Sequence, residues 1–278
     1  MLILRIPAVL IPAGFYHRML LQEVVMEEDK SYRMPLIGDM APAFHAITTQ
    51  GEIDFPQDYY GCWVVLFSHP ADFTPVCTTE FMTFASMINE FKALNTELVG
   101  LSIDSIYSHI AWLRKIRELV WKDIKHVEVT FPLIADISMD IAKMYGMLHP
   151  NNSTTATVRA VFIIDPTGMI RTILYYPAST GRNMQEIMRI IMALQKADCE
   201  KVATPANWLP CDDVILPPPG TCGAALERVE RTYENQYCLD WFLCFRQSSC
   251  MPCDKNDPEI LPYPSMYPSR NRRNHRIP

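Results

Sequence analysis

Between residues 34 and 200 the chain alternates short apolar runs with stretches in which apolar residues recur at helical spacing. The runs are continuous and rich in β-branched residues, and they predict buried strands at 63–67, 97–103, 160–164 and 170–174. The amphipathic stretches predict helices at 79–94, 108–120, 140–145 and 184–196. Strands that alternate with helices indicate an α/β layer fold, and the turn at 165–168 predicts a hairpin between the last two strands.

The pattern changes on either side of this region. We interpret residues 1–33 as an N-terminal extension that is not part of the fold, and residues 34–200 as the folded domain. Prolines punctuate residues 201–250, which is typical of an extended C-terminal arm rather than of a core. Residues 251–278 are rich in proline, asparagine and arginine with little to bury, so we expect a disordered tail there.

Composition narrows the function classes. The 278 residues are 49% hydrophobic and 20% charged, which is typical of a soluble globular protein. The net charge of -6 argues against a general nucleic-acid binder. No apolar segment approaches the ~20 residues that span a bilayer, so we expect no membrane partner and a cytoplasmic location. Seven of the nine cysteines lie at or after Cys199, a distribution that suits redox chemistry better than a disulfide scaffold.

Candidate chemistry lies between the first predicted strand and the helix that follows it, in the stretch Pro70-Ala-Asp-Phe-Thr-Pro-Val-Cys77. The spacing places Cys77 in the first turn of the helix, where the dipole and unpaired backbone N–H groups favour a thiolate. A single buried cysteine is more often an inert small hydrophobe. The position of Cys77 alone therefore leaves both interpretations open.

The pattern Pro-x-x-x-Thr-x-x-Cys resembles the active-site signature of the peroxiredoxins. The longer string Ser68-His-Pro-Ala-Asp-Phe-Thr-Pro-Val-Cys-Thr-Thr-Glu80 resembles the one-cysteine (peroxiredoxin-6-like) branch and its archaeal and bacterial thiol peroxidases. Blocks beginning at Met34, Thr157 and Trp208 carry the resemblance to about Cys244. It implies a thioredoxin-like fold with a central mixed sheet flanked by helices, and an arm that embraces the partner subunit of a homodimer. Rings of such dimers are also implied.

The resemblance implies a thiol peroxidase that reduces hydrogen peroxide and organic hydroperoxides through a cysteine sulfenic acid. Cys77 would be the peroxidatic nucleophile, and Thr74 would place its hydroxyl beside sulfur and peroxide. Pro70 would shield the thiolate from water. Arg159 would lower the thiol pKa and bind the peroxide, for which its permanent charge and forked donors are suited.

Three more residues match substrate-binding positions of the resembled family. His69 would line the pocket, Glu80 would orient Arg159 through a charge-assisted hydrogen bond, and Arg182 would be a second arginine near the site. A structural ion pair explains Glu80 and Arg182 nearly as well.

In the segment Cys238-Leu-Asp-Trp-Phe-Leu-Cys244, the resemblance makes Cys238 the resolving residue that meets Cys77 of the partner subunit, with Cys244 as its exchange partner. It implies no cofactor and no bound metal, only an external thiol reductant such as thioredoxin.

Two alternatives remain open. Cys238, Cys244, Cys250 and Cys253 could form a zinc-binding C-terminal module, although the first pair is spaced more loosely than in zinc fingers. The chain could also act as a redox-regulated oligomeric chaperone, which the sequence does not exclude.

Overall fold

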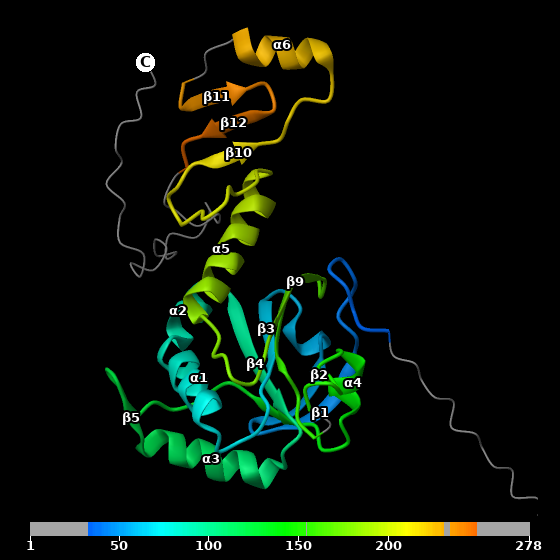
Figure 1. The fold of residues 1–278 in the computed structure, drawn as a ribbon, viewed down its shortest axis with the longest axis vertical. Coiled ribbons are helices and arrows are strands. Elements are labelled where there is room, and N and C mark those ends of the chain that lie inside the picture. The colour runs from blue at the N-terminus through cyan, green and yellow to red at the C-terminus, as the bar shows by residue number, and fades with distance from the viewer. Residues whose placement is uncertain (1–32, 154, 231–233, 249–278) are drawn as a thin grey trace, which may run out of the picture. The chain divides into compact units, whose positions relative to one another are not determined.

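The computed structural model describes residues 33–153, 155–230 and 234–248. Its main element is a seven-stranded sheet with the order β2-β1-β7-β4-β3-β8-β9 (Figure 1). The strands span Phe44–Thr48 (β1), Gly51–Phe55 (β2), Trp63–Ser68 (β3), Thr96–Ser102 (β4), Leu133–Ala135 (β7), Arg159–Ile164 (β8) and Ile170–Tyr176 (β9). β3 runs parallel to β4 and antiparallel to β8, so the sheet is mixed, as expected.

Helices cover both faces of this sheet, and Figure 1 shows α1 and α3 on one side and α4 on the other. The helices of the domain are Pro75–Ser86 (α1), Ile88–Ala93 (α2), Ile106–Glu118 (α3), Asp140–Met144 (α4) and Met184–Glu200 (α5). Short elements complete it: the 3-10 helix η1 (Gln57–Tyr59) and the ribbon of β5 (Val120–Trp121) and β6 (Ile124–Lys125). None of the helices that the structure describes is long and apolar enough to cross a membrane.

The core has two halves because successive side chains of a strand point to opposite faces. Val65 and Phe67 of β3 pack with apolar residues of α1, α3 and α5. Val64 and Leu66 pack on the other face, with residues of α4 and β1. All six residues of β3 are buried, which explains why this strand reads as a continuous apolar run in the sequence.

The four predicted strands are present with ends shifted by one or two residues, and β8 and β9 form the predicted hairpin. The predicted helix at 79–94 is wrong in its start and in its continuity. The helix begins at Pro75, because proline suits the first helical position, and α1 ends at Ser86, with Met87 between it and α2.

The C-terminal segment is more structured than the predicted extended arm. It forms a three-stranded antiparallel sheet, β10-β12-β11, and one helix: Val214–Leu216 (β10), Leu243–Arg246 (β12), Gln236–Asp240 (β11) and Cys222–Glu230 (α6). The prolines at 217–219 lie in the connection between β10 and α6. Val214 and Cys244 are fully buried, and Glu200 at the end of α5 accepts a hydrogen bond from Arg246 at 2.6 Å.

Candidate active site

The loop after β3 places Cys77 in the first turn of α1. Phe73 adopts a left-handed conformation with φ 54°, and Thr74 is extended at the helix N-cap. The Thr74 hydroxyl donates to the Ala71 carbonyl at 2.9 Å and makes no capping bond. The Cys77 side chain is fully buried, while Pro70 is half-buried. The sulfur therefore lies inside the protein, at a helix N-terminus, without a hydroxyl cap.

Arg159 reaches this sulfur from the first residue of β8. Its Nη1 donates to the Cys77 Sγ at 3.2 Å and to Glu80 Oε2 at 2.8 Å. Its Nε and Nη2 both donate to the Ala178 carbonyl, at 3.1 and 2.8 Å. The guanidinium is thus held on two sides, and its positive charge stabilises negative charge on the sulfur.

Glu80 joins the two arginines. Arg182 donates its backbone N–H and Nε to Glu80 Oε1 at 2.8 and 3.0 Å, and its Nη2 to Oε2 at 2.6 Å. Its Nη1 donates to the carbonyls of Ser68 and Ala160. Burial by itself would raise the pKa of Glu80, but the charge and hydrogen bonds of Arg182, with the charge of Arg159, outweigh it and lower that pKa.

The charges of this cluster do not cancel. Arg159 and Arg182 carry two positive charges and Glu80 carries one negative charge, and the three side chains are 2% exposed or less. One positive charge is left, and the Cys77 thiolate would neutralise it. The cluster is therefore suited to hold an anion at the position of the sulfur.

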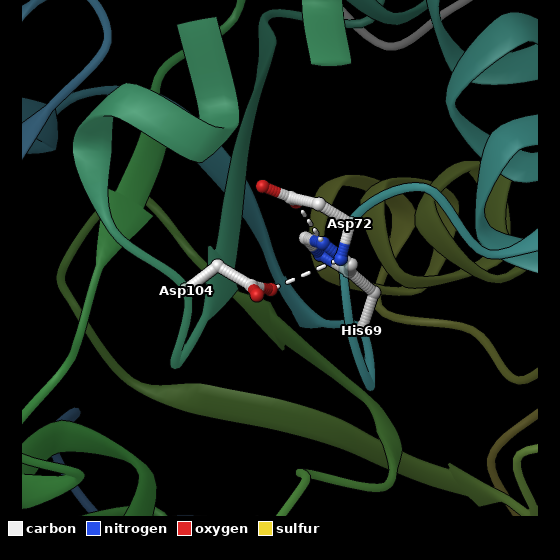
Figure 2. A group of neighbouring side chains, drawn as sticks. All are labelled: His69, Asp72 and Asp104. Atoms are coloured by element: carbon white, nitrogen blue, oxygen red, sulfur yellow. Dashed lines mark hydrogen bonds and ion pairs between the residues drawn. The ribbon is translucent and has the colours of Figure 1, made fainter. Parts of the chain in front are cut away.

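His69 lies behind the same loop with two acidic residues. His69, Asp72 and Asp104 bring ligand atoms within 4.8 Å of one another, a spacing that could hold a metal ion (Figure 2). Hydrogen bonds already occupy these groups: His69 Nε2 contacts Asp72 Oδ1 at 3.0 Å, and Asp104 Oδ2 accepts from the Asp72 N–H at 3.0 Å. These contacts make the group a hydrogen-bond network.

The structure thus brings together Cys77, Arg159, Glu80 and Arg182 in direct contact. The Thr74 hydroxyl donates to the Ala71 carbonyl at 2.9 Å, and its placement beside the sulfur stays a prediction. Asp72 and His109, whose side chains lie 2.8 Å apart, were not predicted as site residues from the sequence. The only available signal was that Asp72 lies inside the motif.

Comparison with known proteins gives matches over most of the chain. Residues 37–173 match the model of the AhpC/TSA family, and residues 193–231 match the C-terminal domain of 1-Cys peroxiredoxin. A peroxiredoxin of Methanosarcina mazei is 64% identical over 217 residues, 78% of this chain and 99% of that protein. A peroxiredoxin of Aquifex aeolicus is 52% identical over 221 residues, 76% of this chain and 96% of that protein. The chain belongs to the peroxiredoxin family.

Solved peroxiredoxin structures agree with the fold. A yeast mitochondrial 1-Cys peroxiredoxin, described with glutathione and thioredoxin systems, is 42% identical with a TM-score of 0.66 and covers 77% of this chain and 100% of its own. A cysteine-to-serine mutant of peroxiredoxin 6 from Arenicola marina is 33% identical with a TM-score of 0.66, covering 80% and 99%. The predicted thioredoxin-like fold and thiol-dependent peroxidase activity toward hydroperoxides are confirmed.

In this peroxiredoxin, Cys238 and Cys244 are joined by a disulfide across neighbouring positions of β11 and β12. Neither sulfur is then a thiolate available to zinc, and Cys250 and Cys253 lie outside the described residues, as do the N-terminal extension to residue 32 and the predicted tail. Cys211 is also disulfide-bonded. The C-terminal segment therefore carries oxidised cysteines, while Cys77 is a thiol.

Proposed function

We propose that Cys77 is the peroxidatic cysteine of this thiol peroxidase. Its thiolate attacks one oxygen of the hydroperoxide, the O–O bond breaks, and the other oxygen leaves as hydroxide or alkoxide and takes up a proton. Cys77 becomes a sulfenic acid. The observation that supports this assignment is the 3.2 Å contact of Arg159 Nη1 with Cys77 Sγ, inside a buried cluster with one positive charge in excess.

The surrounding residues have separate roles in the proposal. Arg159 stabilises the thiolate and the leaving oxygen with donors fixed in place, an arrangement that needs no reorganisation during the reaction. Glu80 and Arg182 hold the Arg159 guanidinium in position. Thr74 and Pro70 line the entrance through the loop, and His69 lines its inner side.

We propose that Cys238 of a partner subunit resolves the sulfenic acid. Its thiol displaces water and forms a disulfide with Cys77; the Cys244 thiolate then attacks the Cys238 sulfur and releases the Cys77 thiolate. The Cys238–Cys244 disulfide is the product expected of this second step, which supports the assignment. An external thiol such as thioredoxin or glutathione would reduce it, as a cytoplasmic location would allow.

The proposed assembly is a homodimer formed through the C-terminal segment, and such dimers would associate into rings. Large apolar side chains of this segment are exposed in the single chain, with Leu226 67% and Phe242 50% exposed. A partner subunit that covers them would remove apolar area from water. Light scattering of wild-type protein tests this: a monomer at micromolar concentration would contradict it.

The peroxidatic assignment is tested by replacing Cys77 with serine. Peroxide consumption should fall to the background rate, because serine is not ionised at neutral pH. Cys62→Ser is the matched control, since Cys62 is also a thiol but is half-buried outside the arginine cluster. Full peroxidase rate in Cys77→Ser would overturn the assignment.

A further inference from the structure

Two histidines share one buried carboxylate next to the active-site loop. Asp72 Oδ1 lies 3.0 Å from His69 Nε2, and Asp72 Oδ2 lies 2.8 Å from Nδ1 of His109 in α3. The second ring nitrogen of His109 lies 3.1 Å from the Ile134 carbonyl. Both imidazoles are fully buried and the carboxylate is 1% exposed.

The partners of these nitrogens determine where the protons are. The Ile134 carbonyl only accepts hydrogen bonds, so His109 Nε2 carries a proton. Burial would raise the pKa of Asp72, but hydrogen bonds and charges of the two rings outweigh it and lower the pKa to about 2. The carboxylate is thus ionised and also only accepts. His109 Nδ1 and His69 Nε2 must therefore be protonated, which makes His109 an imidazolium and the group of three neutral overall.

This count leaves His69 Nδ1 without a proton. It is the one buried side-chain nitrogen or oxygen without a hydrogen-bond partner in the part of the chain that the structure describes. A further proton there is opposed: burial lowers the pKa of His69, and the positive charges of His109 and Arg182 lower it too, against the effect of Asp72. His69 Nδ1 is accordingly a lone-pair acceptor.

The His69 ring packs against the helix that carries Cys77. Its centroid lies 4.9 Å from the ring of Phe81, which follows Cys77 by one helical turn. It lies 5.1 Å from Trp112, whose indole N–H donates to Thr78, the residue after Cys77. The imidazole that carries the acceptor nitrogen is thus packed against α1, the helix whose first turn holds Cys77.

We propose that His109 and Asp72 are positioning residues, whose ion pair holds His69 as the tautomer with its lone pair on Nδ1, an acceptor for the O–H group of a hydroperoxide at Cys77. Arg159 and Arg182 supply only donors, whereas a hydroperoxide also carries a donor O–H that needs an acceptor. This deepens the proposed function and rests on Cys77 as the peroxidatic residue. The tautomer itself is independent of that assignment.

The first test measures protonation directly in the full-length wild-type protein. Solid-state ¹⁵N spectra of histidine-labelled protein distinguish protonated from unprotonated ring nitrogens, and the spectrum of His69→Gln assigns the signals of His69. At neutral pH we expect His69 protonated only at Nε2 and His109 protonated at both nitrogens. A proton on His69 Nδ1, or a neutral His109, would overturn the proposal. Cys77→Ser should give the same spectrum, which separates this result from the fate of the peroxidatic assignment.

The second test removes the positive charge of His109 and then the negative charge of Asp72. His109→Asn keeps a nitrogen donor toward Asp72 but removes the positive charge, so His69 should take up a proton at Nδ1 and lose its acceptor. We expect the second-order rate constant with hydrogen peroxide to fall about tenfold, the effect of losing one hydrogen bond in the transition state. Replacing Asp72 by Asn in the same protein removes the excess negative charge. This double variant should regain a second-order rate constant within about threefold of that of wild type.

A merely structural role predicts the opposite, because the double variant would then be at least as impaired as the single one. That result, or an unchanged His69 spectrum in His109→Asn, would overturn the proposal. Asp104→Asn is the matched control, since Asp104 bonds the Asp72 N–H and the Ser102 hydroxyl but neither imidazole. Its rate and its His69 spectrum should match those of wild type. Near-ultraviolet circular dichroism confirms that each variant is folded before its rate is compared.

Discussion

Replacing Glu80 by glutamine tests whether the arginine cluster depends on a buried charge. The Glu80 side chain is 2% exposed and accepts four hydrogen bonds, one from Arg159 and three from Arg182. Glutamine keeps the size of the side chain and one acceptor oxygen. Its NH2 group replaces the second oxygen and faces N–H donors of the arginines, so about half of the four contacts become unfavourable.

The expected cost follows from these four contacts. Hydrogen bonds to a charged group contribute about 1.5–3 kcal/mol each, so four give about 6–12 kcal/mol as an upper bound. Glutamine retains about half, which leaves a loss of roughly 3–6 kcal/mol. Removing one partner of a buried ion pair costs about 3–5 kcal/mol, which agrees with this figure. We expect Glu80→Gln to lower the free energy of unfolding by that amount at pH 7.

The pH dependence supplies a second measurement. The folded pKa of Glu80 is lowered below its unfolded value of about 4.3, so its stabilising contribution is complete above that value. It is lost as the pH falls through the folded pKa. Urea denaturation should therefore show a constant difference between wild type and Glu80→Gln near neutral pH, and a shrinking difference in acid.

The control is Glu186→Gln, because Glu186 forms a two-bond ion pair with Arg189 at 2.6 and 2.8 Å on a more exposed surface. Its loss should cost about 1 kcal/mol or less. A cost for Glu80→Gln no larger than for Glu186→Gln, or one that does not change in acid, would refute the reasoning.

Arg159→Lys should lower the second-order rate constant with peroxide about 100-fold, since an ammonium cannot reproduce the fixed fork; stopped-flow measurement checks this, and a rate like that of the Arg171→Lys control would contradict it. Cys244→Ser should accumulate a disulfide-linked dimer through Cys77 and Cys238 after one equivalent of peroxide, because the exchange partner is missing; a monomer on a non-reducing gel would count against the proposed resolution. Phe67→Ala should cost about 3–5 kcal/mol of unfolding free energy in urea denaturation, because Phe67 is fully buried and stacks on Phe84. A loss below about 1 kcal/mol would show that the core relaxes around the cavity.

The strands at the centre of the sheet could be predicted because burial on both faces leaves an unbroken apolar run, as in β3. The start of α1 could not be predicted from apolar spacing, since the first apolar position of the periodic pattern, Phe81, lies six residues after Pro75. β1 and β2 were missed because half of their positions are exposed. The C-terminal sheet was missed because its strands are short, with one buried residue each in β10 and β12 and none in β11.

The site shows a similar division. The motif drew attention to Cys77, and the family resemblance to Arg159, but the contact between them joins residues 82 positions apart. It arises because β3 and β8 pair antiparallel, with Phe67 opposite Val161, so that the end of one strand meets the start of the other. His109 had no signal of its own, since its partner Asp72 lies 37 residues earlier and only the packing of α3 brings them together.

The excess positive charge around Cys77 has a consequence for damage by too much oxidant. A sulfenic acid is neutral and does not neutralise that positive charge. The sulfinate formed by a second peroxide is an anion, like the original thiolate. The Glu80–Arg159–Arg182 cluster would therefore stabilise the sulfinate of Cys77 as well as it stabilises the thiolate of the resting enzyme. The charges around Cys77 thus do not oppose overoxidation. How much active enzyme remains under excess peroxide would depend on how fast a second thiol reacts with the sulfenic acid.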